Sequence, residues 1–393
     1  MKKKLTLSAL FLAHSLSAMT LGEIIDTSLA KSPSLASIDA RIAANKQNIL
    51  ISDQFANPEI FLSKNSISSS QAMSQSIVSL KQKLPYPSKL AKQKDVATAK
   101  DKILQERLNA AKVLLVAKIK NEAYTIWEFE ELYKIIDDYI DLTEQNIDLY
   151  ESYTSIDENQ HMGIMKAKLS LSDLEVQKSA LRAKIASAYA RLSYLAAFPV
   201  ADLELSLAIK KKPDLDALQA TLANNPEMLI REKEIQKESA KVQLADINNY
   251  PDFNVFAGYS YRENFSNYVN LGVGISLPIY GTEDYKEEEA KATLLSAKSL
   301  KEDTKISINS TLRVYYAQML SSYEIYHIIQ DDALPQVLHM FELSNSSISI
   351  GSDLFKYIDV LFQKLDLEQK SIKAVGNYNR ARAQIAKLAG ELQ

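Results

Sequence analysis

The chain has 393 residues, a formal net charge of −3 and no cysteine. The missing basic excess argues against nucleic-acid binding, and the missing cysteine excludes disulfides and a lipid-anchor cysteine. After the N-terminal segment, no stretch approaches the roughly 18 apolar residues that identify a transmembrane helix.

Residues 1–18 have the pattern of a secretory signal peptide. A basic start of three lysines is followed by an apolar run from Leu5 to Ala13 and by small residues up to Ala18. That run is too short to span a membrane, so we expect export with cleavage near Ala18. Loss of the three lysines lowers the formal charge of the mature chain from −3 to about −6.

The rest of the chain repeats itself in one constant register and without a gap. The matched positions include three prolines and several later residues: Pro33 with Pro226, Pro58 with Pro251, Pro85 with Pro278, Tyr133 with Tyr326, and Leu195 with Leu388. Such self-similarity predicts two copies of one structural unit. We place the first repeat at residues 19–211 and the second at residues 212–393.

Each repeat is expected to open with helix, at residues 20–54 and 214–248. Pro33 and Pro226 lie inside these stretches as Ser-Pro and Asn-Pro steps, which favour turns. We therefore expect each opening stretch to consist of two shorter helices.

A β-hairpin follows in each repeat, at about residues 57–85 and 251–279. In the second hairpin, apolar residues alternate with small or polar ones: Phe253, Val255, Ala257, Tyr259 and Tyr261, then Val269, Leu271, Val273, Ile275 and Leu277. This alternation predicts one apolar face, and strands of about 10 residues match transmembrane β-strands. The alternative is a soluble hairpin packed on a sandwich.

The second hairpin also supplies the residues that we expect to face the membrane or its interface. Aromatic residues near the strand ends are typical of interfacial girdles, and the alternating aliphatic residues lie between them. The predicted set is Phe253, Val255, Tyr259, Tyr261, Tyr268, Val269, Leu271, Val273, Ile275 and Tyr280.

Long helices are expected next, because residues 88–162 and 282–334 contain neither glycine nor proline. A helix of roughly 65 residues would be roughly 100 Å long, which indicates a coiled coil or a helical tube. Pro335 interrupts the second long helix, where we expect a kink and not a break.

Each repeat then reverses direction and returns as a second helix. The reversals are predicted near residues 156–163, with Gly163 as a turn residue, and near residues 344–353, with Gly351 as the other. The returning helices are predicted at residues 165–198 and 353–391.

Together these elements resemble the outer-membrane efflux protein family, the TolC-like channel-tunnels, over essentially the whole mature chain. The local marks are short motifs that open or close the hairpins or follow the second reversal: Asn57-Pro58-Glu59, Tyr250-Pro251-Asp252, Leu84-Pro85, Leu277-Pro278, and Gly351 followed by Ile358-Asp359-Val360-Leu361 and Gln363. Each motif is weak alone, but their order and spacing across both repeats are specific.

The resemblance implies a mainly α fold with a small β part. Tandem-duplicated long antiparallel helices would form a trimeric α-barrel across the periplasm. Two β-hairpins per subunit would contribute to a 12-stranded transmembrane β-barrel in contact with outer-membrane lipid. It also implies a periplasmic adaptor (membrane fusion) protein and an inner-membrane pump of the resistance-nodulation-division or ABC type as partners.

Acidic residues near the two reversals are the candidates for a pore or gate. Asp157, Glu158, Asp353 and Asp359 would lie toward the periplasmic end of such a tunnel, where threefold symmetry turns one inward carboxylate into a ring of three. A carboxylate ring in a narrow pore favours cations. The alternative is that they cap helices or lie on solvated faces.

No catalytic constellation, cofactor motif or metal-ligand spacing is found. The interval between His327 and His339 does not place two ligands together on one helix, and no Gly-rich phosphate loop or nucleophile elbow occurs. We therefore predict a non-enzyme without cofactors.

The predicted function is the outer-membrane exit duct of a tripartite efflux or type I secretion system, which passively conducts substrates expelled by the pump. The alternative is a soluble periplasmic coiled-coil scaffold or adaptor without a pore. The transported substrate cannot be read from the sequence.

Overall fold

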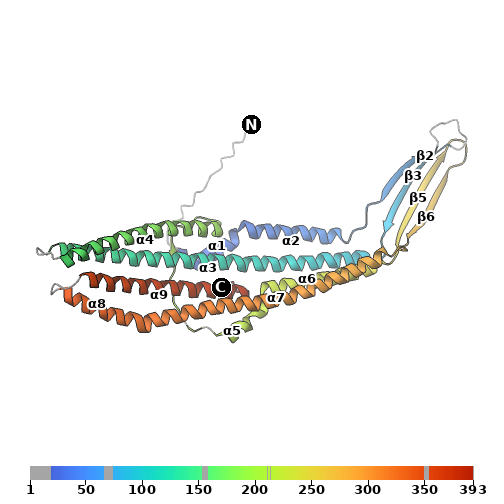
Figure 1. Cartoon of the computed structure of the whole chain (residues 1–393). Coiled ribbons are helices and arrows are strands. Elements are labelled where there is room, and N and C mark those ends of the chain that lie inside the picture. Colours follow the sequence, from blue (N-terminus) through green and yellow to red (C-terminus); the bar gives the residue numbers. More distant parts are fainter. Residues whose placement is uncertain are drawn as a thin grey trace, which may run out of the picture. The chain divides into compact units, whose positions relative to one another are not determined.

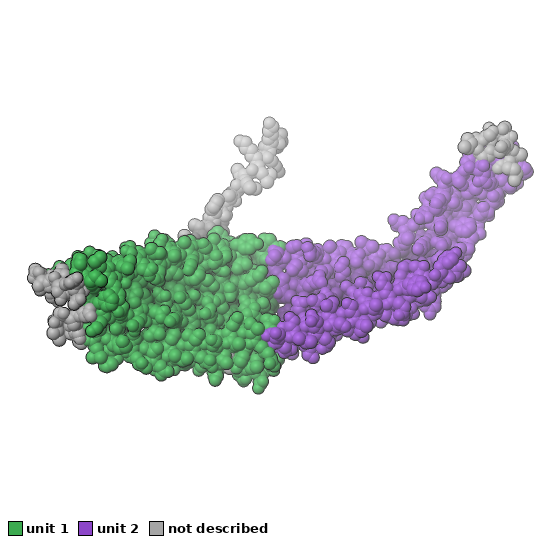
Figure 2. Space-filling model, viewed as in Figure 1, with its two compact units in different colours: residues 1–33, 112–220, 311–393 green, residues 34–111, 221–310 purple. Residues whose placement is uncertain are grey.

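The computed structural model describes residues 19–65, 74–152, 158–209, 211–212, 214–348 and 354–392. The predicted signal peptide and its cleavage site therefore lie outside the described residues. The chain forms two compact units, shown in Figure 2: unit 1 comprises residues 1–33, 112–220 and 311–393, and unit 2 comprises residues 34–111 and 221–310. Each unit takes segments from both halves of the sequence, so the units and the proposed repeats are different divisions of the chain.

The two halves contain the same order of elements. The first half has α1 (Leu21–Lys31), α2 (Pro33–Ile51), β2 (Glu59–Lys64), β3 (Gln75–Leu84), α3 (Lys89–Glu151) and α4 (Glu158–Ala196). The second half has α5 (Leu215–Ala220), a 3₁₀ turn (Thr221–Asn224), α6 (Pro226–Asn248), β5 (Asp252–Arg262), β6 (Tyr268–Ser276), α7 (Thr282–His327), a π-helical segment (Ile328–Ala333), α8 (Leu334–Ile348) and α9 (Leu354–Ala389). The described chain is thus mainly helical with a small β part, as predicted (Figure 1).

The opening stretches are interrupted at the two predicted prolines. Pro33 and Pro226 are each the first residue of a helix, where the missing N–H is not needed. Thr20 and Glu23 form a capping box that begins α1, and the Asn225 side chain accepts a hydrogen bond from the N–H of Met228 at the start of α6. Local capping chemistry therefore decides where these helices begin.

The predicted turn role of Gly163 is wrong. Gly163 lies within α4, which begins at Glu158, and a Cβ placed on it would come within 3.0 Å of the Leu354 Cβ. The small size of Gly163 lets α4 and α9 pack closely near their starts, and the backbone does not reverse at this position. Gly351, the other predicted turn residue, lies outside the described residues.

Unit 1 contains the main apolar core. The core residues come from α3, α4 and α9, with Phe341 of α8 packed against them: Leu132, Ile136, Tyr139, Ile140, Ile147, Tyr150, Ile164, Ala167, Leu174, Leu181, Leu354, Tyr357, Ile358, Leu361 and Leu365. The three- and four-residue spacing within each helix is the pattern expected of long packed helices. A short parallel pair of β1 (Met19–Thr20) and β4 (Leu203–Glu204) completes the unit.

The second long helix stays helical through Pro335, and a π-helical segment directly precedes the proline. Before this segment, the repeat register pairs Ile126 with Met319, and both are buried. Beyond the segment, the match is displaced. Thr143 is buried, but the buried residue at the equivalent place in α8 is Val337, one position after the residue that the repeat register pairs with Thr143. The wider π turn therefore absorbs one residue and rotates the faces of α8 by one position. A gapless sequence register does not reveal this change.

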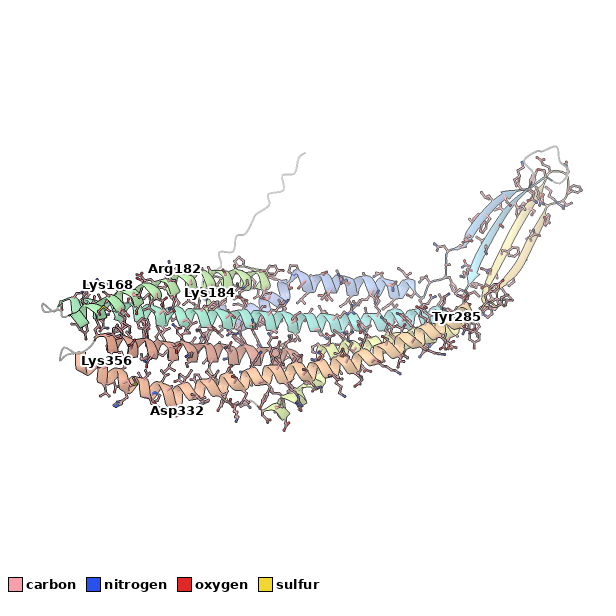
Figure 3. All side chains as sticks on the ribbon, in the orientation of Figure 1. Lys168, Arg182, Lys184, Tyr285, Asp332 and Lys356 are labelled. Carbon is pink, nitrogen blue, oxygen red and sulfur yellow. The ribbon has the colours of Figure 1, made fainter. Side chains whose placement is uncertain are left out.

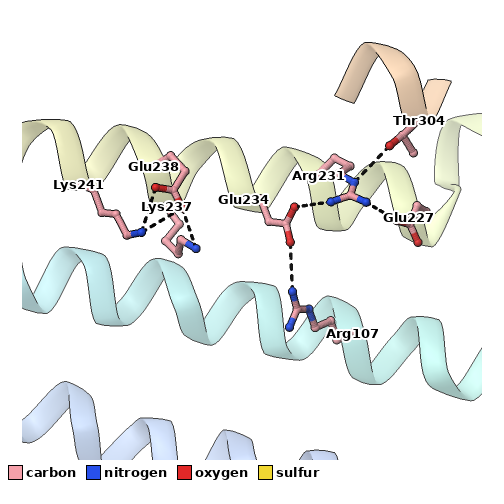
Figure 4. A network of polar contacts seen from close by, with 8 residues as sticks. All are labelled: Arg107, Glu227, Arg231, Glu234, Lys237, Glu238, Lys241 and Thr304. Carbon is pink, nitrogen blue, oxygen red and sulfur yellow. Dashed lines mark hydrogen bonds and ion pairs between the residues drawn. The ribbon is translucent and has the colours of Figure 1, made fainter. Parts of the chain in front are cut away.

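In unit 2, the helices are joined largely by polar side chains (Figure 4). Arg107 of α3 binds Glu234 of α6 at 3.1 Å, and Arg231 of α6 binds Glu234 and Glu227 and donates to the Thr304 hydroxyl of α7. Individual exposed ion pairs stabilise little, typically about 0–1 kcal/mol. Their main effect here is to specify which helices lie together.

Among the described residues, no helix combines the length and hydropathy required to cross a membrane.

Candidate membrane surface and entrance residues

The four strands of unit 2 form one antiparallel sheet in the order β2-β3-β5-β6. Strand register aligns apolar residues in rows across this sheet, one row being Ile60, Leu80, Ala257 and Leu271. A second row is Leu62, Val78, Tyr259 and Val269. All lie on the same face because side chains along a strand alternate between faces. We call this surface the apolar sheet face.

The apolar sheet face is exposed in the single chain. Leu271 is 78% accessible and Leu62 is 77% accessible, values that leave nearly the whole side chain in contact with the surroundings. Soluble monomers rarely expose contiguous apolar patches of more than a few hundred Å². The arrangement therefore indicates contact with lipid or with another protein, and not with water.

Most of the predicted membrane-facing residues lie on this face. Val255, Tyr259, Tyr261, Val269, Leu271, Val273 and Ile275 are exposed there, and Phe253 is partly exposed in the same phase. Tyr280 is 87% accessible but follows the end of β6. The first hairpin adds Ile60, Leu62, Val78 and Leu80, which the predicted set omitted although their alternation is visible in the sequence.

The placement of Tyr268 on that face is wrong. Tyr268 precedes Val269 by one residue and therefore points to the opposite face of the sheet. There its hydroxyl donates to Gln75 Oε1 at 3.3 Å, and Arg262 lies 4.9 Å from its ring centroid. Tyr268 thus belongs to the face that carries small and polar residues.

Glycine on this second face makes room for an aromatic ring. A Cβ on Gly272 would collide with the ring of Phe256 on the neighbouring strand, so Phe256 covers Gly272 directly. Cross-strand coverage of a glycine by an aromatic ring is a known way to stabilise a curved sheet.

A buried ion pair joins β5 to the start of α3. Lys89 is 6% accessible, and its amine donates to Asp252 Oδ1 at 2.8 Å and to the Tyr250 carbonyl at 2.7 Å. The N–H of Tyr86 also donates to Asp252, and the rings of Tyr86 and Tyr250 stack at 4.8 Å. These contacts fix the path of the chain between the end of β3 and the start of α3.

Among the predicted entrance residues, the structure describes the surroundings of Asp359 only. Its carboxylate forms an ion pair with Lys166 of α4, and the Lys166 amine also lies 3.6 Å from the centroid of the Phe355 ring. Lys166 and Asp359 are register partners, so they occupy the same position in the two repeats. Asp353 and Asp157 lie outside the described residues, and Glu158 is described only as the first residue of α4.

A second polar group in unit 1 is buried at the contact of α3 with α9. Tyr139 is 4% accessible, and its hydroxyl donates to Glu368 Oε2 at 2.7 Å and accepts from Lys364 at 3.2 Å. Lys364 also pairs with Glu368 at 3.1 Å. Burial, reinforced by the neighbouring Glu368 carboxylate, raises the pKa of Tyr139 above its ordinary value.

This shift predicts weaker folding at alkaline pH. Tyrosine in the unfolded chain ionises near pH 10, whereas Tyr139 in the folded chain stays protonated, so the free energy of unfolding falls above about pH 10. We expect Tyr139→Phe to reduce that fall by up to about 1.4 kcal/mol per pH unit. Denaturant titrations between pH 9 and pH 11 measure the free energy of unfolding and its dependence on pH. Tyr194→Phe, at an exposed position, is the control, and equal slopes for both variants would refute the assignment.

No group of three or more His, Cys, Asp or Glu side chains suited to a metal ion occurs in the described parts of the chain. His327 has Asp331 as its polar neighbour, with Nδ1 3.0 Å from Oδ2, one helical turn away. This pair lies at the start of the π-helical segment and does not form a metal site.

The family described as Outer membrane efflux protein has a sequence model that matches residues 217–391. No curated protein matches the sequence. Solved structures with a similar fold include the transmembrane channel protein CusC (13% identity, TM-score 0.80, covering 94% of this chain and 92% of that chain). A second is the MtrE outer membrane channel of Neisseria gonorrhoeae in its open state (14% identity, TM-score 0.80, covering 94% of this chain and 89% of that chain). A third is the outer membrane protein VceC of Vibrio cholerae (12% identity, TM-score 0.78, covering 95% of this chain and 97% of that chain).

At such identities, the solved structures establish the fold alone. The family match covers the second half of the chain and includes β5, β6 and α9. The sequence match and the fold shared over 94% of the chain together confirm the predicted resemblance to the outer-membrane efflux protein family.

Proposed function

We propose that this chain is the outer-membrane exit duct of a tripartite efflux or type I secretion system and conducts its substrates passively. The observation that carries this proposal is the exposed apolar sheet face, in which each of the four strands contributes aliphatic side chains. A soluble scaffold or adaptor without a pore would have no reason to expose that surface. The family match over residues 217–391 supports the same conclusion.

The assembly that follows is a homotrimer. In one chain, β2 and β6 are the two edges of a four-stranded sheet. Unpaired backbone groups are not tolerated in hydrocarbon, so we propose that β6 of one subunit pairs with β2 of the next. Three chains would then supply twelve strands of one closed barrel, while their long helices extend into the periplasm.

The duct itself performs no chemistry in this proposal. The energy for transport would come from an inner-membrane pump of the resistance-nodulation-division or ABC type, to which a periplasmic adaptor protein connects the duct. Specificity would be set mainly by those partners.

Cell fractionation separates the duct from the alternative scaffold. The duct should be recovered from the outer-membrane fraction as a trimer that resists dissociation by detergent at room temperature. Release of a monomer by osmotic shock would instead support a soluble periplasmic scaffold and would overturn the proposal.

Asp359 remains our candidate for a carboxylate ring at the periplasmic entrance. Because Lys166 neutralises it within the same chain, Asp359→Ala would leave three unpaired lysines, and we expect the channel to shift toward anion conduction. Reversal potentials of single channels in planar bilayers under a salt gradient measure this shift. Asp366→Ala, which removes an exposed carboxylate of α9 paired with Lys370, is the control. Unchanged selectivity of Asp359→Ala would exclude a ring at this position.

A further inference from the structure

The two repeats differ at one helix contact in unit 1, and this difference points to a binding groove. In the first repeat, Arg191 of α4 pairs with Glu122 of α3 at 2.7 Å. Further along the same contact, the amine of Lys184 (labelled in Figure 3) lies 5.8 Å from the centroid of the Phe129 ring. A long ion pair and a large ring thus lie at the contact of these helices.

The second repeat has smaller or uncharged residues at all four positions. Gln384 and Tyr315 replace the pair of Arg191 with Glu122, and Asn377 and Ser322 replace Lys184 and Phe129. These four residues line a groove of about 800 Å³ between α9 and α7, to which Asn121 of α3 also contributes. This volume is within the range of ligand sites, roughly 300–1,000 Å³.

Most of the residues that line the groove carry a hydrogen-bonding group without net charge. The lining cation Arg380 donates to the buried Glu128 carboxylate and to Asn377 Oδ1, so its charge is neutralised. The side chains of Gln318, Gln384 and Ser321 have no hydrogen-bond partner among the described residues. Amides and hydroxyls both donate and accept hydrogen bonds, which suits a ligand rich in neutral hydroxyl groups.

The lining disfavours a peptide ligand. A helix that docks in a groove is normally held by a row of apolar anchors, whereas only Ile325, Ala317 and Ala381 are aliphatic here. An extended peptide requires the free backbone groups of a sheet edge, and the groove is built from helices whose backbone groups are already paired. The faces of the Tyr315 ring and Ile325 would instead suit the C–H faces of a sugar ring.

We propose that this groove binds a neutral oligosaccharide. The side-chain amides hydrogen-bond the sugar hydroxyls, and the groove stays open because the second repeat lacks the filling side chains of the first. The π-helical segment begins shortly after Ile325, at Ile328, and directly follows the groove. Such segments occur frequently at functional sites.

Titration of the full-length protein in detergent with maltotriose and with triacetylchitotriose tests the proposal. We expect saturable binding of at least one trisaccharide by calorimetry or saturation-transfer NMR. Ser322→Phe combined with Asn377→Lys copies the first repeat, fills the groove and should weaken binding at least tenfold. Gln318→Leu combined with Gln384→Leu removes two of the four lining amides with little change in volume and should give a similar loss. Glu324→Lys, exposed on α7 outside the groove, should leave the affinity unchanged.

Three results would overturn the proposal. The first is that the wild-type protein binds neither sugar saturably, and the second is that all variants bind equally. The third is loss of the trimer in the groove-filling variant while the subunit remains folded, because a neighbouring subunit and not a sugar would then occupy the groove. If the groove-filling variant does not fold, the two leucine substitutions decide between these outcomes.

Discussion

Replacing Leu271 with arginine is expected to destabilise the membrane-inserted protein by about 2–4 kcal/mol. Leu271 lies near the middle of β6 and is one of the most exposed residues of the apolar sheet face. If this face contacts hydrocarbon, the guanidinium loses its hydration without gaining a partner. Urea titration of folding into phospholipid vesicles measures the loss.

Asn270→Arg is the matched control for this experiment. Asn270 precedes Leu271 on the same strand but points to the opposite face, where it lies across from Gly258. In the proposed barrel, that face borders water, so we expect a change within about 1 kcal/mol, as for substitutions near an interface. Equal losses for both variants would contradict the assignment of the two faces.

Replacing Asp252 with asparagine is expected to destabilise the protein by about 3–5 kcal/mol, the usual cost of leaving a buried charge unpaired. Lys89 is almost completely buried and would keep only the Tyr250 carbonyl as a strong acceptor. Thermal or denaturant unfolding of the purified protein measures the effect.

The repeat supplies a control for this prediction as well. Glu59 occupies the position of Asp252 in the first repeat and is exposed, so Glu59→Gln should change the free energy of unfolding little. Lys89→Met combined with Asp252→Asn should recover most of the loss, because replacing both members of a buried pair is often nearly neutral. Failure of the double variant to recover stability would mean that the unpaired charge of Lys89 is not the cause of the loss.

The long helices and the hairpins were predictable because their signals are local. Glycine and proline are absent from residues 88–162, and α3 runs from Lys89 to Glu151. The period-two alternation of the second hairpin predicted strands that agree closely with β5 and β6. The residue type of Tyr268, an aromatic residue at a strand end, predicts an interfacial position, whereas its phase in β6 places it on the opposite face of the sheet.

The predicted site residues depended on contacts that local patterns do not contain. Nothing near Asp359 in the sequence indicates that Lys166 pairs with it, although the repeat register places both at the same position. The sequence around Gly163 predicts a turn, whereas its contact with Leu354 places it in the interface of two helices. The first hairpin gives a weaker signal in the sequence because its apolar residues are fewer, whereas strand pairing extends the apolar sheet face through it.

The sequence by itself determined the helix lengths, the hairpins and the duplication, since helix and strand periodicity and proline breaks act over short stretches of chain. Only the tertiary structure decided which positions paired by the repeat register differ in their burial and contacts. The π-helical segment before Pro335 moves the buried face of α8 by one residue, and a groove lies at the contact of α7 with α9 where an ion pair lies at that of α3 with α4. The second difference depends on the size and charge of side chains that meet across helices, which the matching of positions between the two repeats does not reveal.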